Sequence, residues 1–266
     1  MRWIACLMLM ASPLAAWSQI AAPGAADSRH WLMVVSTKNL DPAHEDAFNH
    51  WYDEIDIPDV LKVPGYKRAR RGLRQSVPGF SSPQQEAEDG RYVALYDIET
   101  SNMDRTIIDM LMAAKKMDVT GRSIDALKVT ERVYFRRLGD VLEIPGPKRS
   151  GERTYLYLER VTCCRDEATA VALDDWYDNT RVPDARAGVD GLVRIARFEV
   201  YRVVMVEPRQ VPHFLTVYEL ASDSAEHVVA AMRRLDEQEK KADRMSELFD
   251  GTASALYQQI KDVPRH

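Results

Sequence analysis

A nine-residue pattern occurs twice in this chain and constrains its fold more than any other feature. Residues 51–59 read Trp-Tyr-Asp-Glu-Ile-Asp-Ile-Pro-Asp, and residues 176–184 read Trp-Tyr-Asp-Asn-Thr-Arg-Val-Pro-Asp. Five of the nine positions are identical at an offset of 125 residues, and two of these five hold aromatic residues. Such a match rarely arises by chance, so the sequence predicts an internal repeat.

The residues that follow the pattern recur at nearly the same spacing: Gly65 and Arg71 match Gly191 and Arg197, and residues 92–98 match residues 214–220. Small changes in spacing are expected where loops differ in length. A stretch rich in Gly and Pro separates the two copies and is typical of a linker. We therefore predict a first repeat at 29–138, a linker at 139–153 and a second repeat at 154–262.

Each copy shows the same order of secondary-structure signals. The first copy predicts strands at 31–37, 66–75, 92–98 and 129–138, with amphipathic helices after the first and third strands. The second copy predicts strands at 154–161, 192–205, 213–220 and 253–260, with helices from Asp166 and Ser222. In the first copy, we expect Asp41, followed by Pro42, to cap one helix, and Ser101 or Asn102 to cap the other.

The order β-α-β-β-α-β is that of a ferredoxin-like unit, an antiparallel sheet with both helices on one face. The opposite face of each sheet must also be covered. The sequence therefore predicts an α+β fold in which two tandem ferredoxin-like units pack their sheets together. The expected result is an intramolecular two-sheet α+β barrel with the helices outside.

The N-terminal residues do not continue this pattern. Arg2 gives a basic start, residues 3–10 are all apolar, and Ala16-Trp17-Ser18 supplies small residues for cleavage before Gln19. These are the three parts of a secretory signal peptide, here residues 1–18. Eight apolar residues are too few to span a bilayer core of about 30 Å. We expect a secreted or periplasmic protein without a membrane segment after cleavage; a membrane anchor is the alternative, and a lipoprotein through Cys6 is a weaker one.

The composition excludes several classes of protein. Apolar residues make up 45% of the chain and charged residues 29%, which excludes wholesale disorder. The net charge of −5 argues against binding to nucleic-acid phosphates. Cleavage of the signal peptide leaves two cysteines, the adjacent pair Cys163 and Cys164. A ring between neighbours closes no useful loop, so we favour two unpaired apolar residues over a vicinal disulfide, the alternative in an oxidising compartment.

The repeated pattern contains the candidate functional residues. Trp51 and its counterpart Trp176 are expected to pack a helix on a sheet, whereas Tyr52 and Tyr177 fit either a core position or a ligand contact. Asp53 needs a cationic partner, and Arg71 or Arg70 on the next strand can supply it. The pairing is either a clamp that joins helix to sheet in both copies, or a contact that binds an anion or oxyanion in a pocket.

Other site chemistries lack support in the sequence. His44 and His50 are six residues apart and do not share a helix face, so they do not predict a metal pair. The remaining histidines are scattered, and the chain has no Gly-rich phosphate loop, no G-x-S-x-G elbow and no H-E-x-x-H pattern. We therefore expect neither a metal nor a cofactor.

The stretch from Phe48 to Tyr66, followed by Ala69-Arg70-Arg71, resembles the signature of the dimeric α+β barrel superfamily, with the closest likeness to EthD-like and stress-responsive barrel proteins. The resemblance implies ferredoxin-like subunits that pair sheet to sheet, here both within one chain. It also implies a small hydrophobic or aromatic ligand. Members of the superfamily include isomerases, polyketide cyclases and cofactor-free monooxygenases.

The chain departs from the family at one position. Where a histidine is common, the first copy has Asp56 and the second has Arg181. An aspartate can act as a base if burial raises its pKa. We therefore assign Asp56 or Tyr52 to proton transfer and Arg71 to an oxyanion. Four further residues are assigned to ligand contact: Trp51, Tyr96, Tyr177 and Arg197.

Three functions fit this assignment: a cofactor-independent isomerase, cyclase, lyase or monooxygenase, a non-catalytic binding or stress-related protein, and a purely structural or interaction module. One half is expected to hold the site while the other serves as scaffold, in a monomer or a homodimer.

Overall fold

The computed structural model describes residues 29–82, 90–146, 150–164, 166–206, 212–249 and 253–265. The predicted signal peptide lies outside these residues. In the described residues, eight strands form one closed antiparallel barrel in the order β1-β3-β2-β8-β5-β7-β6-β4. The strands are β1 (His30–Asn39), β2 (Tyr66–Arg74), β3 (Tyr92–Glu99), β4 (Leu127–Glu143), β5 (Arg153–Val161), β6 (Leu192–Val206), β7 (Phe214–Ser222) and β8 (Ala253–Pro264).

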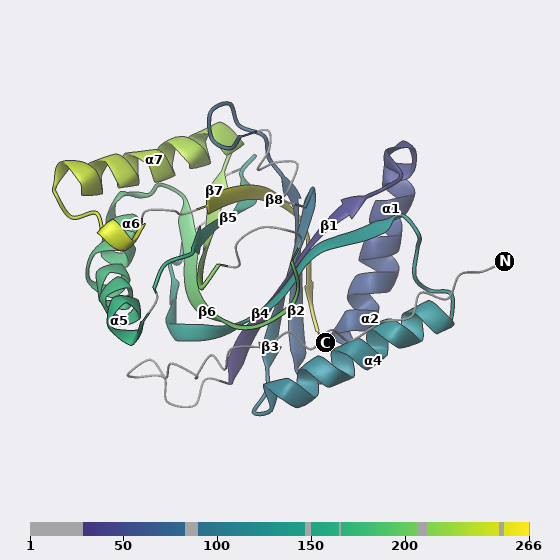
Figure 1. Ribbon diagram of the computed structural model, residues 1–266. Coiled ribbons are helices and arrows are strands. Elements are labelled where there is room, and N and C mark those ends of the chain that lie inside the picture. Colours follow the sequence, from purple (N-terminus) through teal and green to yellow (C-terminus); the bar gives the residue numbers. More distant parts are fainter. Residues whose placement is uncertain are drawn as a thin grey trace.

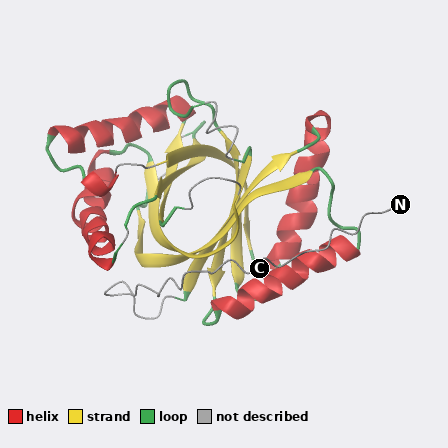
Figure 2. Cartoon of the chain, in the orientation of Figure 1, coloured by secondary structure: helices red, strands yellow, loops and turns green. Residues whose placement is uncertain are grey.

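The helices lie outside the barrel on two opposite sides (Figure 1; Figure 2). One side carries α1 (Glu45–Trp51), α2 (Ile57–Leu61) and α4 (Met103–Val119), and the other carries α5 (Glu167–Trp176), α6 (Val182–Gly188) and α7 (Ala225–Lys241). Short 3-10 turns precede α1 at Pro42–His44 and follow α7 at Glu247–Phe249. None of the helices in the described part of the chain has the length and apolar character needed to cross a bilayer.

The barrel consists of two halves with the same element order. We call β1 to β4 with α1, α2 and α4 the first half, and β5 to β8 with α5, α6 and α7 the second half. Each half runs β-α-β-β-α-β, as predicted, and the strand orders β4-β1-β3-β2 and β8-β5-β7-β6 correspond. The sequence predicted two packed sheets. Instead, hydrogen-bonded pairs at β2·β8 and β4·β6 join the halves into one sheet without a free edge.

The length of β4 and β6 explains how these two strands join the halves. The sequence predicted that the last strand of the first copy ends at Leu138, but β4 continues to Glu143. Its final residues pair with the start of β6, where Leu142 lies opposite Ile195. Residues expected in the linker therefore take part in the barrel wall.

Alternating side chains fill the inside of the barrel and cover its outside. The inner cluster holds Leu32, Val34, Val93, Leu95, Val133, Phe135, Leu156, Leu158, Ala196, Phe198, Leu215, Val217, Ala255 and Tyr257, all buried. Two outer clusters lie beneath the helices, one in each half. The central part of the barrel is thus packed with apolar side chains, and the helices bury the outer apolar faces.

The predicted helix caps have mixed outcomes. Asn102 caps α4 by accepting a hydrogen bond from the backbone N–H of Arg105 (3.0 Å), as expected. Asp166 likewise caps α5. Asp41 stands at the predicted N-cap position, before Pro42, but of a 3-10 turn, and its carboxylate makes no cap bond and contacts His44 Nδ1 at 2.7 Å instead. The His44 ring, three residues away, competes with the backbone N–H groups for the Asp41 carboxylate.

Both copies of the repeated pattern contain a π-helical turn. The turns span Tyr52–Asp56 and Tyr177–Arg181, and each begins at the tyrosine of the pattern. The N–H of Ile57 donates to the carbonyl of Tyr52, and the N–H of Val182 donates to that of Tyr177, five residues back in each case. A proline follows each turn and cannot donate a backbone hydrogen bond. Turns of this kind are frequent at functional sites.

Two glycines at matching positions end these helical segments. Gly65 has φ +95° and Gly191 has φ +73°, a conformation that favours glycine. Their carbonyls accept hydrogen bonds from Glu99 (2.8 Å) and Ala221 (2.7 Å), respectively. A Cβ on Gly191 would lie 2.1 Å from the Ala221 carbonyl oxygen, so only glycine fits there. The chain thus enters β2 and β6 through the same turn.

Candidate functional site

Arg71 of β2 joins the first helical segment to the sheet. Its side chain is fully buried and donates to Asp53 Oδ1 at 3.0 Å and to Asn49 Oδ1 at 2.7 Å. The guanidinium carbon lies 4.3 Å from the ring centroids of both Tyr52 and Tyr92. The predicted pairing of Asp53 with Arg71 is confirmed, and both Nη groups of Arg71 are engaged in it.

The second half repeats this clamp. Arg197 of β6 donates to Asp178 and Asp174, and its guanidinium carbon lies 4.7 Å from the ring centroid of Tyr177. Asp178 occupies the place of Asp53 in the repeated pattern. Arg70, the alternative partner for Asp53, instead binds Asp97 (2.7 Å) and Glu219. The clamp is therefore a shared feature of the two halves.

The tryptophans of the pattern are also used structurally. The indole N–H of Trp51 donates to the carbonyl of Arg122 at 2.7 Å, and that of Trp176 donates to the carbonyl of Arg244 at 2.7 Å. Each bond ties the first helical segment of its half to the end of the second helix. The donor that a ligand would need on Trp51 is thus already occupied.

Asp56 marks the main difference between the two halves, because the matching residue of the second half is Arg181. Asp56 ends the π-turn of the first half, is half-buried, and accepts a hydrogen bond from the Tyr96 hydroxyl at 3.4 Å. Burial raises the pKa of Asp56 to about 6, although Arg132, Tyr96 and Arg71 each act to lower it. A carboxyl with this pKa exchanges a proton near neutral pH.

Two tyrosines stand beside Asp56. The hydroxyls of Tyr52 and Tyr96 bond to one another, and both side chains are buried. Burial and the neighbouring Asp56 raise the pKa of Tyr52 above its usual range, and burial also raises that of Tyr96. Both hydroxyls therefore remain protonated at neutral pH and can donate hydrogen bonds. The structure brings together Asp56, Tyr52 and Tyr96 and places Arg71 against the Tyr52 ring.

The same place in the second half carries a closed charge network. Arg181 replaces Asp56 and is fully buried. It donates to Glu159 (2.6 Å) and Glu239 (3.0 Å) and pairs with Asp236 (2.7 Å). Tyr177, predicted as a ligand contact, donates its hydroxyl to Glu159 at 2.7 Å instead. Every predicted polar group of this half is thus engaged with another residue of the chain.

Sequence reasoning missed Arg132 on β4. Arg132 shares a face of β4 with Tyr134, two residues further on, and its charge lowers the pKa of Asp56, Tyr52 and Tyr134. In the sheet, Arg132 is the cross-strand partner of Val35, whereas the matching pair in the second half is Ser254 and Glu159. Neither residue belongs to the repeated pattern. Only the register of the strands shows that the first half has a cation on β4 where the second half has an acid on β5.

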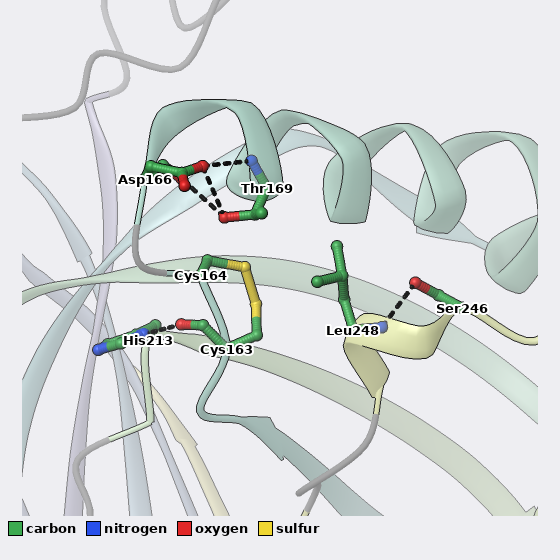
Figure 3. Close-up of a disulfide and its surroundings, with 7 residues drawn as sticks. All are labelled: Cys163, Cys164, Asp166, Thr169, His213, Ser246 and Leu248. Atoms are coloured by element: carbon green, nitrogen blue, oxygen red, sulfur yellow. Dashed lines mark hydrogen bonds between the residues drawn. A yellow bond between two sulfur atoms is a disulfide. The ribbon is translucent and has the colours of Figure 1, made fainter.

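The cysteine prediction is wrong. Cys163 and Cys164 form a disulfide, so the alternative that we disfavoured is present (Figure 3). Cys164 has φ +76°, and the pair follows β5 just before the Asp166 cap of α5. The carbonyl of Cys163 contacts His213, and both cysteines pack against a small apolar cluster with Leu173. Adjacent cysteines can close a ring where the backbone takes this conformation.

Two hollows in the described part of the chain lie away from Asp56. The first, between Leu173, Tyr177 and Arg197, has no room for a water molecule. The second is an open hollow of about 460 Å³ between Val77 and α7. Among the described residues, no group of three His, Cys, Asp or Glu side chains is placed to hold a metal ion.

Comparisons with known proteins place the fold. No protein-family model and no curated relative matches the chain. A proposed monooxygenase from Fusobacterium nucleatum subsp. nucleatum matches with a TM-score of 0.53 at 8% identity, over 90% of this chain and 96% of that one. The likeness shows an α+β barrel fold.

Two further solved structures have lower scores. A proposed monooxygenase from Lactobacillus acidophilus NCFM has a TM-score of 0.48 at 12% identity, over 89% of this chain and 97% of that one. The encapsulated DyP-type peroxidase from Mycobacterium smegmatis has a TM-score of 0.49 at 10% identity, over 91% of this chain and 95% of that one. At such identities the comparison concerns the fold and not the chemistry.

Proposed function

We propose that this protein is an exported acid–base enzyme of the dimeric α+β barrel superfamily, formed by duplication of one ferredoxin-like unit. The repeated Trp-Tyr-Asp pattern, the matching π-turns and the repeated arginine clamp support the duplication. The apolar N-terminal run supports export. The first half holds the site, and the second half serves as its scaffold.

The protonation behaviour of Asp56 carries the proposal. It is a half-buried carboxyl with a pKa of about 6, and in the described residues it belongs to no ion pair. A general base works best when its pKa lies near the working pH. The matching position in the second half, Arg181, is neutralised on three sides and has no such capacity.

Asp56 accepts a proton in the first step of the proposed reaction. Above pH 6 it is ionised and takes the proton from a C–H or O–H group of a small hydrophobic or aromatic molecule. The protonated hydroxyls of Tyr52 and Tyr96 then donate hydrogen bonds to the oxygen on which negative charge develops. A proton transfer of this kind needs neither a metal nor a cofactor. Isomerisation, cyclisation, lyase chemistry and cofactor-free oxygenation can all begin in this way.

Arg71 acts as a positioning residue in this scheme. Because Asp53 and Asn49 occupy both of its Nη groups, Arg71 holds the π-turn against the sheet. The clamp fixes Tyr52 beside Asp56, and the matching clamp at Arg197 gives the second half the same frame. The oxyanion role first assigned to Arg71 therefore has no support in its contacts.

A second candidate is a non-catalytic binding protein built on the same frame. The observation that favours it is the close packing between helices and sheet, where Tyr52, Phe48 and Tyr96 are all buried in one apolar cluster. In that case Asp56 would bind a ligand without exchanging a proton with it.

A ligand screen followed by kinetics tests the enzyme. Purified protein that begins at Gln19 is screened against aromatic metabolites by thermal shift, because a ligand raises the melting temperature by mass action. Turnover of each hit is then compared in wild type, Asp56→Asn and the control Asp46→Asn, which alters an exposed carboxylate on α1. We expect Asp56→Asn to lower kcat by about 100-fold or more and Asp46→Asn to change nothing.

The pH profile gives an independent check. With Asp56 as the base, kcat should rise with pH around a midpoint of about 6 in the wild type, and this step should vanish in Asp56→Asn. Full activity and an unchanged profile in the variant would exclude Asp56 as the base.

A further inference from the structure

Arg132 is a half-buried arginine that forms no ion pair with any described residue, although its charge acts on Asp56. No hydrogen bond or ion pair joins its side chain to another described residue, and its Nε is buried without a partner. The other buried arginines considered above, Arg70, Arg71, Arg181 and Arg197, each pair with a carboxylate. Holding a cation partly out of water is costly unless an anion compensates it.

The surroundings of Arg132 show where such an anion would lie. The positive charge acts on Asp56 and on the hydroxyls of Tyr52, Tyr66 and Tyr134. Tyr66 and Tyr134 bond to one another at 3.4 Å, and both rings are buried. In the sheet, Arg132 lies opposite Val35, a member of the same buried cluster as Tyr52, Tyr66 and Tyr134, so its side chain leaves the strand on the face that carries these rings.

The second half shows what the first half lacks. There, the strand residue Glu159 supplies the carboxylate that neutralises Arg181, whereas the first half has Val35 at the place of Glu159. Two of the additional acids around Arg181, Asp236 and Glu239, lie on α7. At the matching positions of α4 the chain has Ala114 and Met117, which carry no charge. Among its described residues, the first half therefore contains a cation, Arg132, that forms no ion pair with a carboxylate.

We propose that the first half binds a small aromatic or hydrophobic molecule bearing an anionic oxygen group, a carboxylate or phenolate, with Arg132 as its counter-ion. This inference rests on the proposed function, since it names the class of substrate for that site. A guanidinium offers several donors in a plane and can hold a carboxylate through two hydrogen bonds. The bound anion then lies next to Asp56, where a proton can pass between them.

Benzoate and benzamide test this inference, because they share size and shape and differ in charge. Calorimetry would measure both at pH 5.5 and low salt in wild type, Arg132→Gln and Arg132→Lys. Arg136→Gln is the control, since Arg136 lies on the same strand and pairs with Glu199. We expect benzoate to bind the wild type at least about tenfold more tightly than Arg132→Gln, as befits a charged hydrogen-bonded pair, with partial recovery in Arg132→Lys.

Three results would overturn the anion site: absence of benzoate binding, equal affinity for benzamide, or full affinity in Arg132→Gln. The comparison of benzoate with benzamide in the wild type remains decisive even if a variant fails to fold. Arg136→Gln should bind benzoate as the wild type does. A loss in this control equal to that in Arg132→Gln would also count against the proposal.

Asp56→Asn separates this inference from the enzyme. The groups that face Asp56 are Tyr52, Tyr96, Asp59, Arg71 and Arg132. A bound anion repels ionised Asp56, so benzoate affinity should fall from pH 5 to pH 8 in the wild type and change little in Asp56→Asn. Benzoate binding that needs Arg132, together with normal turnover in Asp56→Asn, would retain the anion site and refute the proposed base. Turnover that needs Asp56 but not Arg132 would support the proposed base and refute the anion site.

Discussion

The two halves of the barrel hold opposite charges at the same place. In the first half, the π-turn ends in the acid Asp56, and the nearby strand residue is the cation Arg132. In the second half, the π-turn ends in Arg181, and the strand supplies Glu159. The frame around them is shared, since each half has an arginine clamp and a bound tryptophan.

This difference in charge pairing underlies the proposal that the first half holds the site. In the second half three carboxylates contact Arg181, although Arg181 Nε and Glu239 Oε1 are buried without a hydrogen-bond partner. In the first half Asp56 and Arg132 lie near each other without forming an ion pair, and both retain capacity for an outside partner. The second half thus pairs its central cation internally, whereas we propose that Asp56 and Arg132 of the first half serve an outside partner.

Removal of Arg181 should produce the largest loss of stability. Arg181→Met leaves three acids without their cation, and breaking a buried pair in this way costs about 3–5 kcal/mol. Asp56→Asn should not destabilise the fold at neutral pH, because a neutral amide replaces a carboxyl whose ionised form is disfavoured by burial. Urea unfolding monitored by circular dichroism measures both, with the exposed Arg186→Met of α6 as control. Equal losses at the two positions would refute the contrast between the halves.

The two clamps should differ in strength. Arg71 is fully buried between two rings, whereas Arg197 and its partner Asp178 are more exposed, at 11% and 67% of their side chains. We expect Arg71→Gln to cost about 3 kcal/mol and Arg197→Gln about 1 kcal/mol, measured by the same unfolding experiment. A larger loss for Arg197→Gln would show that exposure does not decide the ranking.

The pH dependence of stability should come partly from Glu239. Burial raises its pKa from 4.5 to about 7, so the folded chain binds this proton more tightly than the unfolded chain does. Its stabilising contribution is complete below pH 4.5 and is lost as pH rises through about 7. Glu239→Gln should therefore reduce the loss of unfolding free energy between pH 5 and pH 8 by about 1 kcal/mol or more. The exposed neighbour Glu237→Gln should leave the curve unchanged; an identical curve in Glu239→Gln would contradict the assignment.

The disulfide should have the smallest effect. Because Cys163 and Cys164 are adjacent, their bond constrains little of the unfolded chain. We expect the double variant Cys163→Ser, Cys164→Ser to lose less than about 1 kcal/mol, as measured by urea unfolding in the absence of reductant. A loss as large as that of Arg71→Gln would show that the ring supports the second half more than its position suggests.

The sequence predicted the order of the elements because that information is local. Apolar periodicity and the repeated pattern identified the strands and helices, and Asn102 was recognisable as a cap from its neighbours alone. The pairing of Asp53 with Arg71 was predictable as well, since both recur in each copy. Closure of the barrel at β2·β8 and β4·β6 was not predictable, because those pairings depend on which strand edges meet in space.

The candidate site was predicted only in part, for the same reason. Asp56, Tyr52 and Tyr96 were identified from the pattern and its flanks, and they lie together. Arg132 escaped notice because it lies on a strand far along the chain and has no counterpart of like charge. The π-turn was also missed: Pro58 indicated a disturbed helix but not the form of the disturbance.

The position of β8 in the barrel affects how the protein folds during synthesis. Ala253–Pro264 lies between β2 and β5, two strands that belong to different halves. Until this segment has been synthesised and inserted, the wall stays open along β2 and β5, and both exposed edges can pair with other chains. Contacts between residues about 190 apart in sequence, such as Arg70 with Asp262, make this last insertion slow. A nascent chain of this kind therefore keeps an unclosed barrel until β8 has been synthesised and has paired with β2 and β5.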